Sequence, residues 1–335
     1  MRILLIGAGG VGEAIVKLAV TRNFYEHIVV ADYDLSRAES AVAYVNDPRF
    51  SATQIDAGSA ANIVEVCREH NITHILNAVE PKFVPTIFSA AFTAGANYLD
   101  MAMSLSESHE TDPFHQPGIK LGDAQYAVDE QWERAGKLAL VGMGVEPGLS
   151  NVFARYAQDY LFSEIDEVSV KDGSNLVVRN EAGEEIFAPS FSIWTTIEEC
   201  LNPPLMWSEG KGFYTTEPFS EPEIFDFPEG IGSVECVNVE HEEVAMLPRT
   251  IRAKKFSFKY GLGRDFIQVL KTLNQLGLDR TKPTRVRSAQ GPVDVSPRDV
   301  VAAVLPNPAS IGPFMTGKTC AGVLVTGKDK DGRER

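Results

Sequence analysis

The chain has 335 residues, 44% of them hydrophobic, and a formal net charge of −15 at pH 7. This length is typical of two domains, and the composition provides enough apolar residues for a core in each. The excess of carboxylates disfavours nucleic acids and anionic membrane surfaces as partners. The sequence shows no apolar run long enough to span a membrane and no signal-peptide pattern, so we expect a cytoplasmic protein.

The chain begins with the pattern of a dinucleotide-binding unit. An apolar run at residues 2–6 is followed by the glycine motif G-x-G-x-x-G at residues 7–12 and then by residues with helical spacing. A second apolar run, residues 27–31, ends on Asp32, twenty residues after the last glycine. This order predicts a strand, a phosphate-binding turn, a helix and a second strand that ends in an acid.

Each position of the glycine turn has a predicted role. Gly7 permits the tight turn, Gly9 lets a pyrophosphate approach the backbone, and Gly12 lets the helix pack closely on the strand. Gly10 and Val11 lie at the start of the helix, where free N–H groups favour a phosphate. We therefore assign all five residues to cofactor binding.

Asp32 bears on the choice of cofactor. A carboxylate at this place accepts hydrogen bonds from the ribose hydroxyls of NAD and repels the 2′-phosphate of NADP. Arg37, five residues further on, is either a phosphate ligand or a solvated residue on the first turn of a helix. We predict NAD as the cofactor and keep NADP as the alternative.

Strands and helices continue to alternate through residues 1–160. The further strands are predicted at residues 51–55, 73–77, 97–100 and 138–141. The main helices between them are predicted at residues 60–69, 82–93 and around 131–132. This order is typical of a Rossmann domain, an α/β fold whose doubly wound parallel sheet is covered on both faces. Asn77, Ala78 and Val79 follow the fourth strand, where we expect the nicotinamide ribose.

The pattern changes in residues 161–310, which we interpret as an α+β substrate domain. Strands are predicted at residues 165–171, in antiparallel pairing with one solvated face, and at residues 251–258. Helices are predicted at residues 150–161, 191–199, 265–276 and 296–304. Residues 311–335 contain a strand at 320–326 and a hairpin turn, and we interpret them as the end of a truncated polypeptide.

These segments resemble the saccharopine dehydrogenase and saccharopine reductase-like family, which includes lysine 6-dehydrogenase-like members. The matching stretches are residues 3–12, 56–57, 75–78, 97–100 and 145–150, the last reading V-E-P-G-L-S. The resemblance implies a Rossmann domain with an inserted α+β domain, a nicotinamide cofactor and oxidation of a C–N bond in an amino-acid derivative. It also implies cofactor contacts for Asp56 and Ala57 on the adenine side, although Asp56 could instead be an acid that caps a helix.

The sequence does not determine the substrate, because it differs from the family pattern at one segment. Fungal-type members carry an S-W-S-x-R segment whose Arg holds a substrate carboxylate, whereas residues 189–196 here contain no Arg. We expect an NAD(P)-dependent oxidoreductase acting on the C–N bond of an amino acid or its imine. The alternatives are a polyamine-linked synthase of the homospermidine or carboxynorspermidine type, whose pocket would hold more acids than bases, and a catalytically silent nucleotide-binding regulatory protein. The expected partner is a small amino-acid or amine substrate, and the expected assembly is a homodimer.

The chemistry requires a group that removes or supplies the proton on the substrate nitrogen. Glu146 follows the sixth strand and aligns in the resemblance with an acid that contacts substrate; its alternative is an acid that favours the next helix dipole. Asp100 is either catalytic or a turn cap, and His241 is either a proton shuttle or a surface histidine between acids. Lys255 and Lys259 share one strand face, for a substrate carboxylate or for solvent.

A metal site is not predicted. The four cysteines are far apart in the sequence: Cys67, Cys200, Cys236 and Cys320. Their spacing does not match a zinc site, and free thiols in a reducing compartment are expected. His109, Asp112 and His115 share one loop, but this spacing on an irregular segment is a weak indication of a metal.

Overall fold

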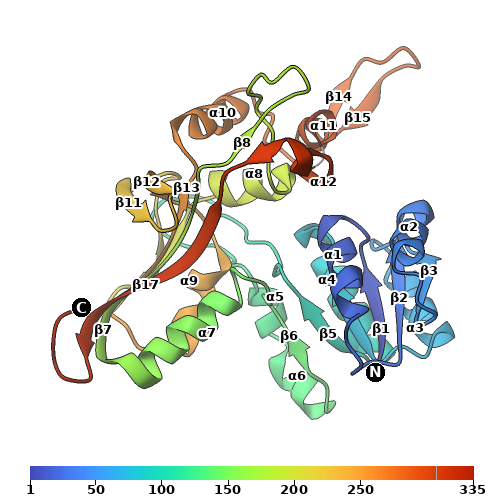
Figure 1. Ribbon diagram of the computed structural model, residues 1–335, viewed down its shortest axis with the longest axis horizontal. Coiled ribbons are helices and arrows are strands. Elements are labelled where there is room, and N and C mark those ends of the chain that lie inside the picture. Colours follow the sequence, from blue (N-terminus) through green and yellow to red (C-terminus); the bar gives the residue numbers. More distant parts are fainter. Residues whose placement is uncertain (307) are drawn as a thin grey trace. The chain divides into compact units, whose positions relative to one another are not determined.

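The computed structural model describes residues 1–306 and 308–335 of the chain (Figure 1). The chain divides into two compact units, the first made of residues 1–106 and 120–149 and the second of residues 107–119 and 150–335. Among the described residues, none of the helices combines the length and the apolar character that crossing a bilayer requires.

The first unit contains a parallel sheet with the strand order β3-β2-β1-β4-β5-β6. The strands are β1 (Arg2–Ile6), β2 (His27–Asp32), β3 (Phe50–Gln54), β4 (His74–Asn77), β5 (Asn97–Asp100) and β6 (Ala139–Leu140). The predicted Rossmann fold is therefore confirmed. The order reverses direction at β1 and β4, and ligands of open parallel sheets bind beyond the carboxyl ends of the strands at such a point.

Helices cover both faces of this sheet. They are α1 (Gly10–Ala19), α2 (Leu35–Val45), α3 (Ala60–Glu69), the short η1 (Pro81–Phe83), α4 (Val84–Ala94), α5 (Asp123–Tyr126) and α6 (Asp129–Arg134). Side chains alternate along a strand, so Leu5 packs in one core with α1 and α2, whereas Leu4 and Ile6 pack in another with α3 and α4. Local residues set the helix ends: the Ser59 hydroxyl accepts a hydrogen bond from the N–H of Asn62, and α4 ends at Gly95, whose φ is 69°.

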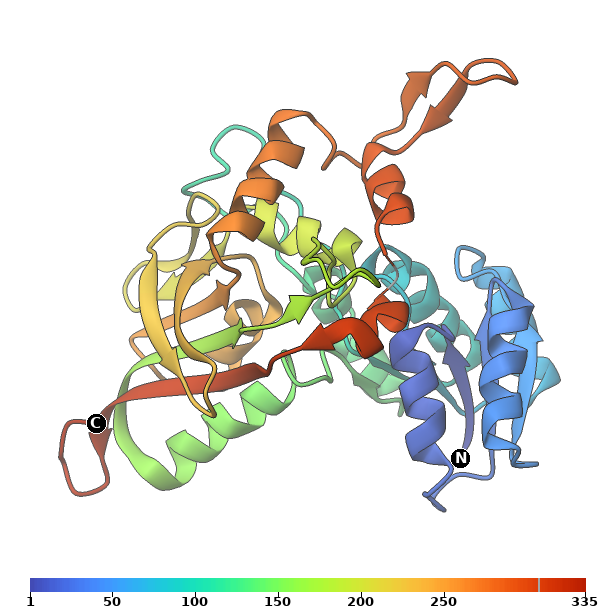
Figure 2. The same ribbon diagram turned by 45° about the horizontal axis from the view of Figure 1, so that its top comes forward.

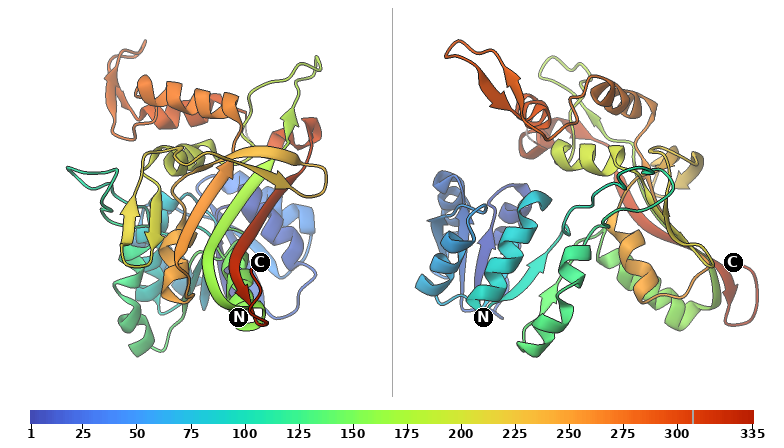
Figure 3. Two further views of the ribbon diagram at one scale, coloured as in Figure 1. Left: turned by 90° about the vertical axis from the view of Figure 1, so that its left-hand side faces the viewer. Right: turned by 180° about the vertical axis from the view of Figure 1, so that it is seen from behind.

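The second unit is built on a mixed sheet in which β7 (Phe162–Ser174) and β13 (Lys255–Gly261) run parallel. On its other side, β7 pairs antiparallel with β17 (Thr319–Asp329), and the left panel of Figure 3 shows the three strands side by side. The remaining strands are β9 (Leu205–Ser208), β10 (Gly212–Thr215), β11 (Glu223–Phe227) and β12 (Gly232–Asn238). The predicted antiparallel pairing of residues 165–171 is confirmed on the side of β17, whereas the neighbour on the other side, β13, is parallel. The prediction of one solvated face is wrong, because residues 168–171 are all buried.

Helices pack against one face of this mixed sheet. They are α7 (Leu149–Tyr156), continued by a π-helical turn (Ala157–Leu161), then α8 (Ile193–Leu201), α9 (Glu242–Met246), η3 (Leu247–Arg249), α10 (Arg264–Gln275) and α11 (Pro297–Val304). Two further short helices, α12 (Pro308–Ile311) and η4 (Gly312–Phe314), follow α11 in the chain. The core contains Val168 and Phe256 of the sheet, Ile197 of α8 and Leu270 of α10. Alternate residues of the strands therefore provide the apolar face.

Two smaller strand pairs complete the second unit. The strands β8 (Val177–Val178) and β16 (Met315–Thr316) pair with each other, as do β14 (Thr284–Val286) and β15 (Val293–Val295). The predicted hairpin turn after β17 is confirmed, because the N–H of Gly332 donates to the carbonyl of Asp329 at 3.0 Å. The last residues return beside β17, and Arg335 and Gly327 exchange two backbone hydrogen bonds.

Candidate functional site

The glycine turn of the first unit has the geometry that a dinucleotide requires. Gly7 has a φ of 104°, and a Cβ there would lie 2.6 Å from the carbonyl oxygen of Ala78. A Cβ on Gly12 would lie 1.9 Å from the carbonyl oxygen of Gly7. In contrast, a Cβ on Gly9 or Gly10 would meet no atom within 4 Å, in front of the first N–H groups of α1. Residues 7–12 therefore fit a pyrophosphate bound at the helix N-terminus.

Asp32 is held in place by two backbone amides at the end of β2. Its Oδ2 accepts from the N–H of Ala8 at 2.8 Å, and its Oδ1 accepts from the N–H of Asp34 at 3.0 Å. An ionised carboxylate has about four acceptor positions, so acceptor capacity remains for a ribose diol. Asp34 caps α2, and Arg37 lies 4.0 Å from its carboxylate. With Asp32 and Asp34 against the single cation Arg37, this end of β2 favours the ribose hydroxyls of NAD over the 2′-phosphate of NADP.

The residues after β4 lie against the glycine turn. The N–H of Ala78 donates to Ile6, the last residue of β1, at 2.8 Å. Asn77 is buried, its side chain donates to the Tyr98 hydroxyl at 3.0 Å, and it accepts from the N–H of Val79 at 3.2 Å. These contacts bring the predicted nicotinamide-ribose residues to the point where the strand order reverses.

Asp56 lies on the loop after β3 and is exposed. Its Oδ1 accepts from the N–H of Gly58 at 2.8 Å, whereas Ser59 provides the cap of α3. The alternative role of Asp56 as the helix cap is therefore wrong. Ala57 packs at the edge of the core beneath this loop.

Asp100 is buried at the end of β5, with an exposed fraction of 1%. Its Oδ1 accepts from the N–H of Gly142 at 2.7 Å, and its Oδ2 accepts from the side chain of Gln125 at 2.7 Å. These contacts join β5 to the segment after β6 and to α5. The sequence left two roles open for Asp100, a catalytic group or a turn cap. These contacts are the ones expected of a turn cap.

Glu146 is half-buried in a tight turn that follows β6. The N–H of Gly144 donates to the carbonyl of Pro147 at 2.7 Å, and Gly148 has a φ of 123°. A Cβ on Gly148 would lie 2.5 Å from the carbonyl oxygen of Gly144, so only glycine fits there. The turn thus fixes the position of Glu146 at the carboxyl edge of the parallel sheet, where Asp100 also lies.

His241 lies in the second unit, immediately before α9, and is buried with an exposed fraction of 2%. Its Nδ1 donates to the Glu243 carboxylate and lies 3.4 Å from Oε2 of Glu242. The interpretation of His241 as a surface histidine is therefore wrong. Glu243 in turn accepts from the hydroxyl of Ser150 at 2.9 Å.

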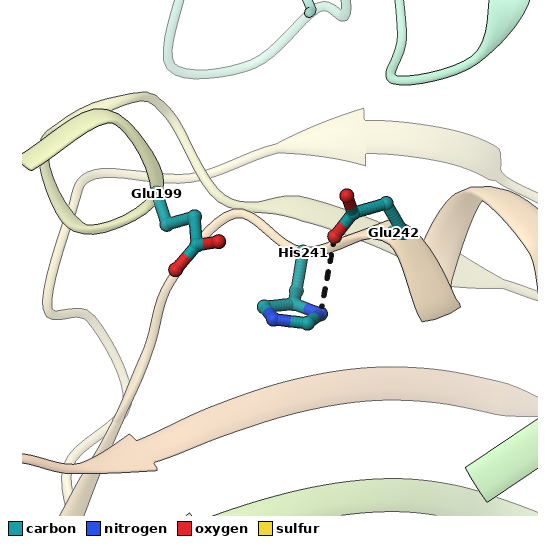
Figure 4. Close-up of side chains that lie close together, drawn as sticks. All are labelled: Glu199, His241 and Glu242. Atoms are coloured by element: carbon teal, nitrogen blue, oxygen red, sulfur yellow. Dashed lines mark ion pairs between the residues drawn. The ribbon is translucent and has the colours of Figure 1, made fainter. Parts of the chain in front are cut away.

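Two residues from other elements complete this arrangement, which we call the His241 cluster: Glu199, His241, Glu242, Glu243 and Tyr260. The Tyr260 hydroxyl, on β13, donates to Oε2 of Glu199 on α8 at 3.2 Å and lies 3.3 Å from Nε2 of His241. Figure 4 shows Glu199 and Glu242 on opposite sides of the imidazole. One ligand atom each from Glu199, His241 and Glu242 lies within 4.8 Å of the others, so the cluster has the donor set to hold a cation.

The His241 cluster has perturbed proton affinities. Burial alone would lower the pKa of His241, but the carboxylates of Glu243, Glu242 and Glu199 outweigh it and raise that pKa well above its usual value. Burial raises the pKa of Glu199 to about 8, with Glu242 and Glu243 adding to the effect and His241 opposing it. Both shifts favour the protonated forms, which are the imidazolium of His241 and the neutral carboxyl group of Glu199.

Sequence reasoning identified His241 but missed Glu199 and Tyr260. No local pattern marks these two residues, because they come from separate elements, α8 and β13, that meet only in the folded chain. The sequence predicts that Lys255 and Lys259 share one strand face, for a substrate carboxylate or for solvent. Lys259 is instead buried, and its ammonium donates to Glu223 at 2.9 Å and to the carbonyl of Glu221 at 2.7 Å.

Known proteins match the chain along its whole length. The family model of the saccharopine dehydrogenase NADP binding domain matches residues 3–140, and that of the saccharopine dehydrogenase C-terminal domain matches residues 144–334. Carboxynorspermidine synthase of Vibrio cholerae serotype O1 is 30% identical over 345 residues, covering 100% of this chain and 80% of the relative. Carboxyaminopropylagmatine dehydrogenase of Synechocystis sp. is 24% identical over 339 residues, covering 100% of this chain and 79% of the relative.

The fold also matches a solved structure. Apo saccharopine dehydrogenase (L-Glu forming) from Saccharomyces cerevisiae superposes with a TM-score of 0.57 at 13% identity, covering 85% of this chain and 61% of that one. This likeness concerns the fold. With family models that span both units, the protein belongs to the saccharopine dehydrogenase family of NAD(P)-dependent oxidoreductases.

Proposed function

We propose that the protein is a reductase that makes a carboxylated polyamine, reducing the imine formed between an amino-acid aldehyde and a diamine or similar amine. This is the polyamine-linked alternative considered from the sequence. Its support is twofold: relatives named for such products align along the whole chain, and the His241 cluster is rich in acids. The cluster is the observation that carries the proposal.

The His241 cluster has the charge to bind one ammonium group of a polyamine substrate, because the carboxylates of Glu242 and Glu243 stand against a single imidazolium. Three carboxyl groups, those of Glu199, Glu242 and Glu243, surround one imidazole inside the second unit. In a buried site, attraction between opposite charges is less screened than in water. Tyr260 and Phe258 add aromatic rings beside the acids, and such rings also favour cations. We expect an ammonium group of the substrate to bind at this cluster.

Reduction of an imine adds a hydride to carbon and a proton to nitrogen. The nicotinamide supplies the hydride when it is bound. The proton must come from the protein or from solvent, and the His241 cluster holds two proton donors near neutral pH, the imidazolium of His241 and the carboxyl group of Glu199. The Tyr260 hydroxyl links them, at 3.3 Å from one and 3.2 Å from the other. We assign proton supply to this pair, and retain Glu146 as the candidate acid for contact with the substrate.

The decisive experiment is a substrate panel with the purified chain. Oxidation of the secondary amine of carboxynorspermidine to an imine, followed by hydrolysis, gives diaminopropane and aspartate semialdehyde. The reverse reaction therefore starts from these two compounds, which are supplied with NADH or NADPH. The expected result is consumption of reduced cofactor only when both are present, and transfer of deuterium from the labelled cofactor to a carboxylated triamine detected by mass spectrometry.

Two other results would each overturn the proposal. Reduction of NAD(P)⁺ with lysine or saccharopine, without coupling of the aldehyde and the diamine, would favour action on the C–N bond of an amino acid. Tight binding of NADH with no turnover of any member of the panel would favour a regulatory protein. The matched variant is Tyr260→Phe, which removes the hydroxyl between His241 and Glu199 and should lower the rate of reduction more than the affinity for amine.

A further inference from the structure

The strands β14 and β15 form an arm that stands out from the helices of its own unit, as Figures 1 and 2 show. Within the part of the chain that the structure describes, these two strands pair only with each other. An isolated two-stranded hairpin is marginally stable in water, and packing against another element is what stabilises it. We call residues 280–295 the hairpin arm.

The base of the hairpin arm is fixed to the second unit by Arg298. This side chain is buried, its guanidinium lies over the ring of Trp194 at 4.7 Å, and it pairs with Glu198 of α8. Its Nε donates to the carbonyl of Asp279 at 2.7 Å, and its backbone N–H donates to the carbonyl of Arg280 at 3.1 Å. The arm is therefore a projecting element with an anchored base.

The two faces of the hairpin arm differ in chemistry. Residues directly opposite each other in an antiparallel pair share a face, so Val286 lies beside Val293, and Thr284 beside Val295. The exposed fractions of Val286 and Val293 are 37% and 40%. Arg285 and Asp294 occupy the other face and form an ion pair at 2.7 Å. One face of the arm thus carries three valines and one threonine, and Val286 and Val293 are partly exposed on it.

The charge of the hairpin arm is opposite to that of the chain. The arm contains four cationic residues, namely Arg280, Lys282, Arg285 and Arg287, against the single carboxylate of Asp294, whereas the whole chain has a net charge of −15. Because the rest of the chain is acidic, the basic arm is attracted to the surface of another copy of the same protein.

We propose that the hairpin arm docks on a second copy of this chain, with its valine face against the partner copy. This gives the homodimer expected from the sequence a specific surface. A few valines cover far less than the roughly 800 Å² per partner of a standard interface. In a dimer with two-fold symmetry, however, the arm of each copy contacts the other copy, so the contact occurs twice. A nucleic acid would be met by the cations of the arm and would leave the valines uncovered, and the charge of −15 opposes it.

The test is the association state of the full chain by analytical ultracentrifugation, over a range of protein and salt concentrations. The parent should be a dimer that weakens as salt rises. Two arm variants remove different components, Arg285→Glu with Arg287→Glu for charge, and Val286→Ser with Val293→Ser for the apolar face. Each should weaken the dimer by about tenfold or more while the chain stays folded. A photo-crosslinking side chain at Gln290, near the tip, should link two copies through an acidic peptide.

The matched control is Arg134→Glu with Arg333→Glu, which makes the same charge change at two exposed arginines outside the arm. This control should dimerise like the parent. A parent that is monomeric at every concentration would overturn the proposal, as would dimers of parental strength in both arm variants. Binding of a nucleic-acid duplex that depends on the arm, at physiological salt and without dimerisation, would assign the arm to nucleic acid instead.

Discussion

The imidazole of His241 lies flat on the ring of Phe258, with centroids 3.8 Å apart and an angle of 5° between the planes. This contact fixes the plane of the imidazole, and within that plane Nδ1 contacts Glu243 while Nε2 faces Tyr260. A charged imidazole gains from an aromatic face, which adds to the effect of the carboxylates. The stack on Phe258 and the contact with Glu243 together leave Nε2 as the nitrogen of His241 that faces Tyr260.

The raised pKa of Glu199 predicts a pH dependence of stability. The folded chain keeps this proton up to a pH of about 8, whereas an unfolded chain loses it near the usual value of 4.5. The contribution of Glu199 to the free energy of unfolding should therefore be largest below pH 4.5. It should fall as the pH rises and be absent above pH 8. Glu199→Gln keeps a neutral side chain, so it should flatten this fall and be more stable than the parent at pH 8 to 9.

Chemical denaturation at several pH values measures this effect. The control is Glu65→Gln, which replaces an exposed glutamate on α3 of the other unit and should leave the pH profile unchanged. Parallel profiles for Glu199→Gln and the parent would contradict this prediction, because they would show that the pKa of Glu199 is the same in the folded and unfolded chain.

The glycine turn predicts opposite effects for two substitutions. Gly9→Val places its side chain in open space, so the fold should survive while the pyrophosphate is excluded. Gly12→Ala puts a Cβ against the carbonyl of Gly7, so the fold itself should lose stability, by about 1–3 kcal/mol for an overpacked position. Thermal unfolding and NADH fluorescence titration separate the two. Normal NADH affinity in a folded Gly9→Val variant would place the phosphate elsewhere.

Asp32 predicts a preference for NADH over NADPH. Its carboxylate is fixed by Ala8 and Asp34, and it can accept from both ribose hydroxyls but repels a 2′-phosphate. Asp32→Ser should narrow the difference between the two dissociation constants, mainly by tightening NADPH. The control Asp47→Ser removes a carboxylate after α2 that pairs with Arg49, and it should leave the ratio unchanged. Equal affinities of the parent for both cofactors would contradict the assignment.

The sequence predicted the elements whose ends are set by neighbouring residues. The helix at 60–69, the strand at 97–100 and the helix opened by Ser296 and Pro297 all lie where capping and periodicity placed them. The strand predicted at 251–258 instead runs from Lys255 to Gly261, because its limits follow the pairing with β7 and not local preference.

The candidate site likewise has one part that the sequence predicts and one part that it does not. The glycine turn and Asp32 belong to one continuous stretch of thirty-two residues, so their spacing could be read directly. The His241 cluster joins α8, the start of α9 and β13, and no local pattern indicates that Glu199 and Tyr260 meet one imidazole. His241 was therefore found by its residue type, and its burial was not foreseen.

Glu146 carries the last prediction, because the turn that fixes it follows the parallel sheet directly. If its carboxylate binds the substrate ammonium or handles its proton, Glu146→Gln should keep the fold and the NADH affinity. Turnover should fall on the order of 10²-fold or more, as for the loss of a general acid or base. If Glu146 only favours the dipole of α7, stability should instead fall by about 0.3–1 kcal/mol with near-normal kinetics.

Steady-state kinetics and thermal unfolding of the same Glu146→Gln sample distinguish these outcomes. The control is Glu133→Gln, an exposed acid on α6 of the same unit, which should change neither quantity. Comparison of kcat with KM adds a further distinction: a lost ammonium contact raises KM for the amine, whereas a lost proton-transfer group lowers kcat. Activity of Glu146→Gln within a few-fold of the parent would remove this residue from the chemistry and leave proton transfer to Glu199 and His241.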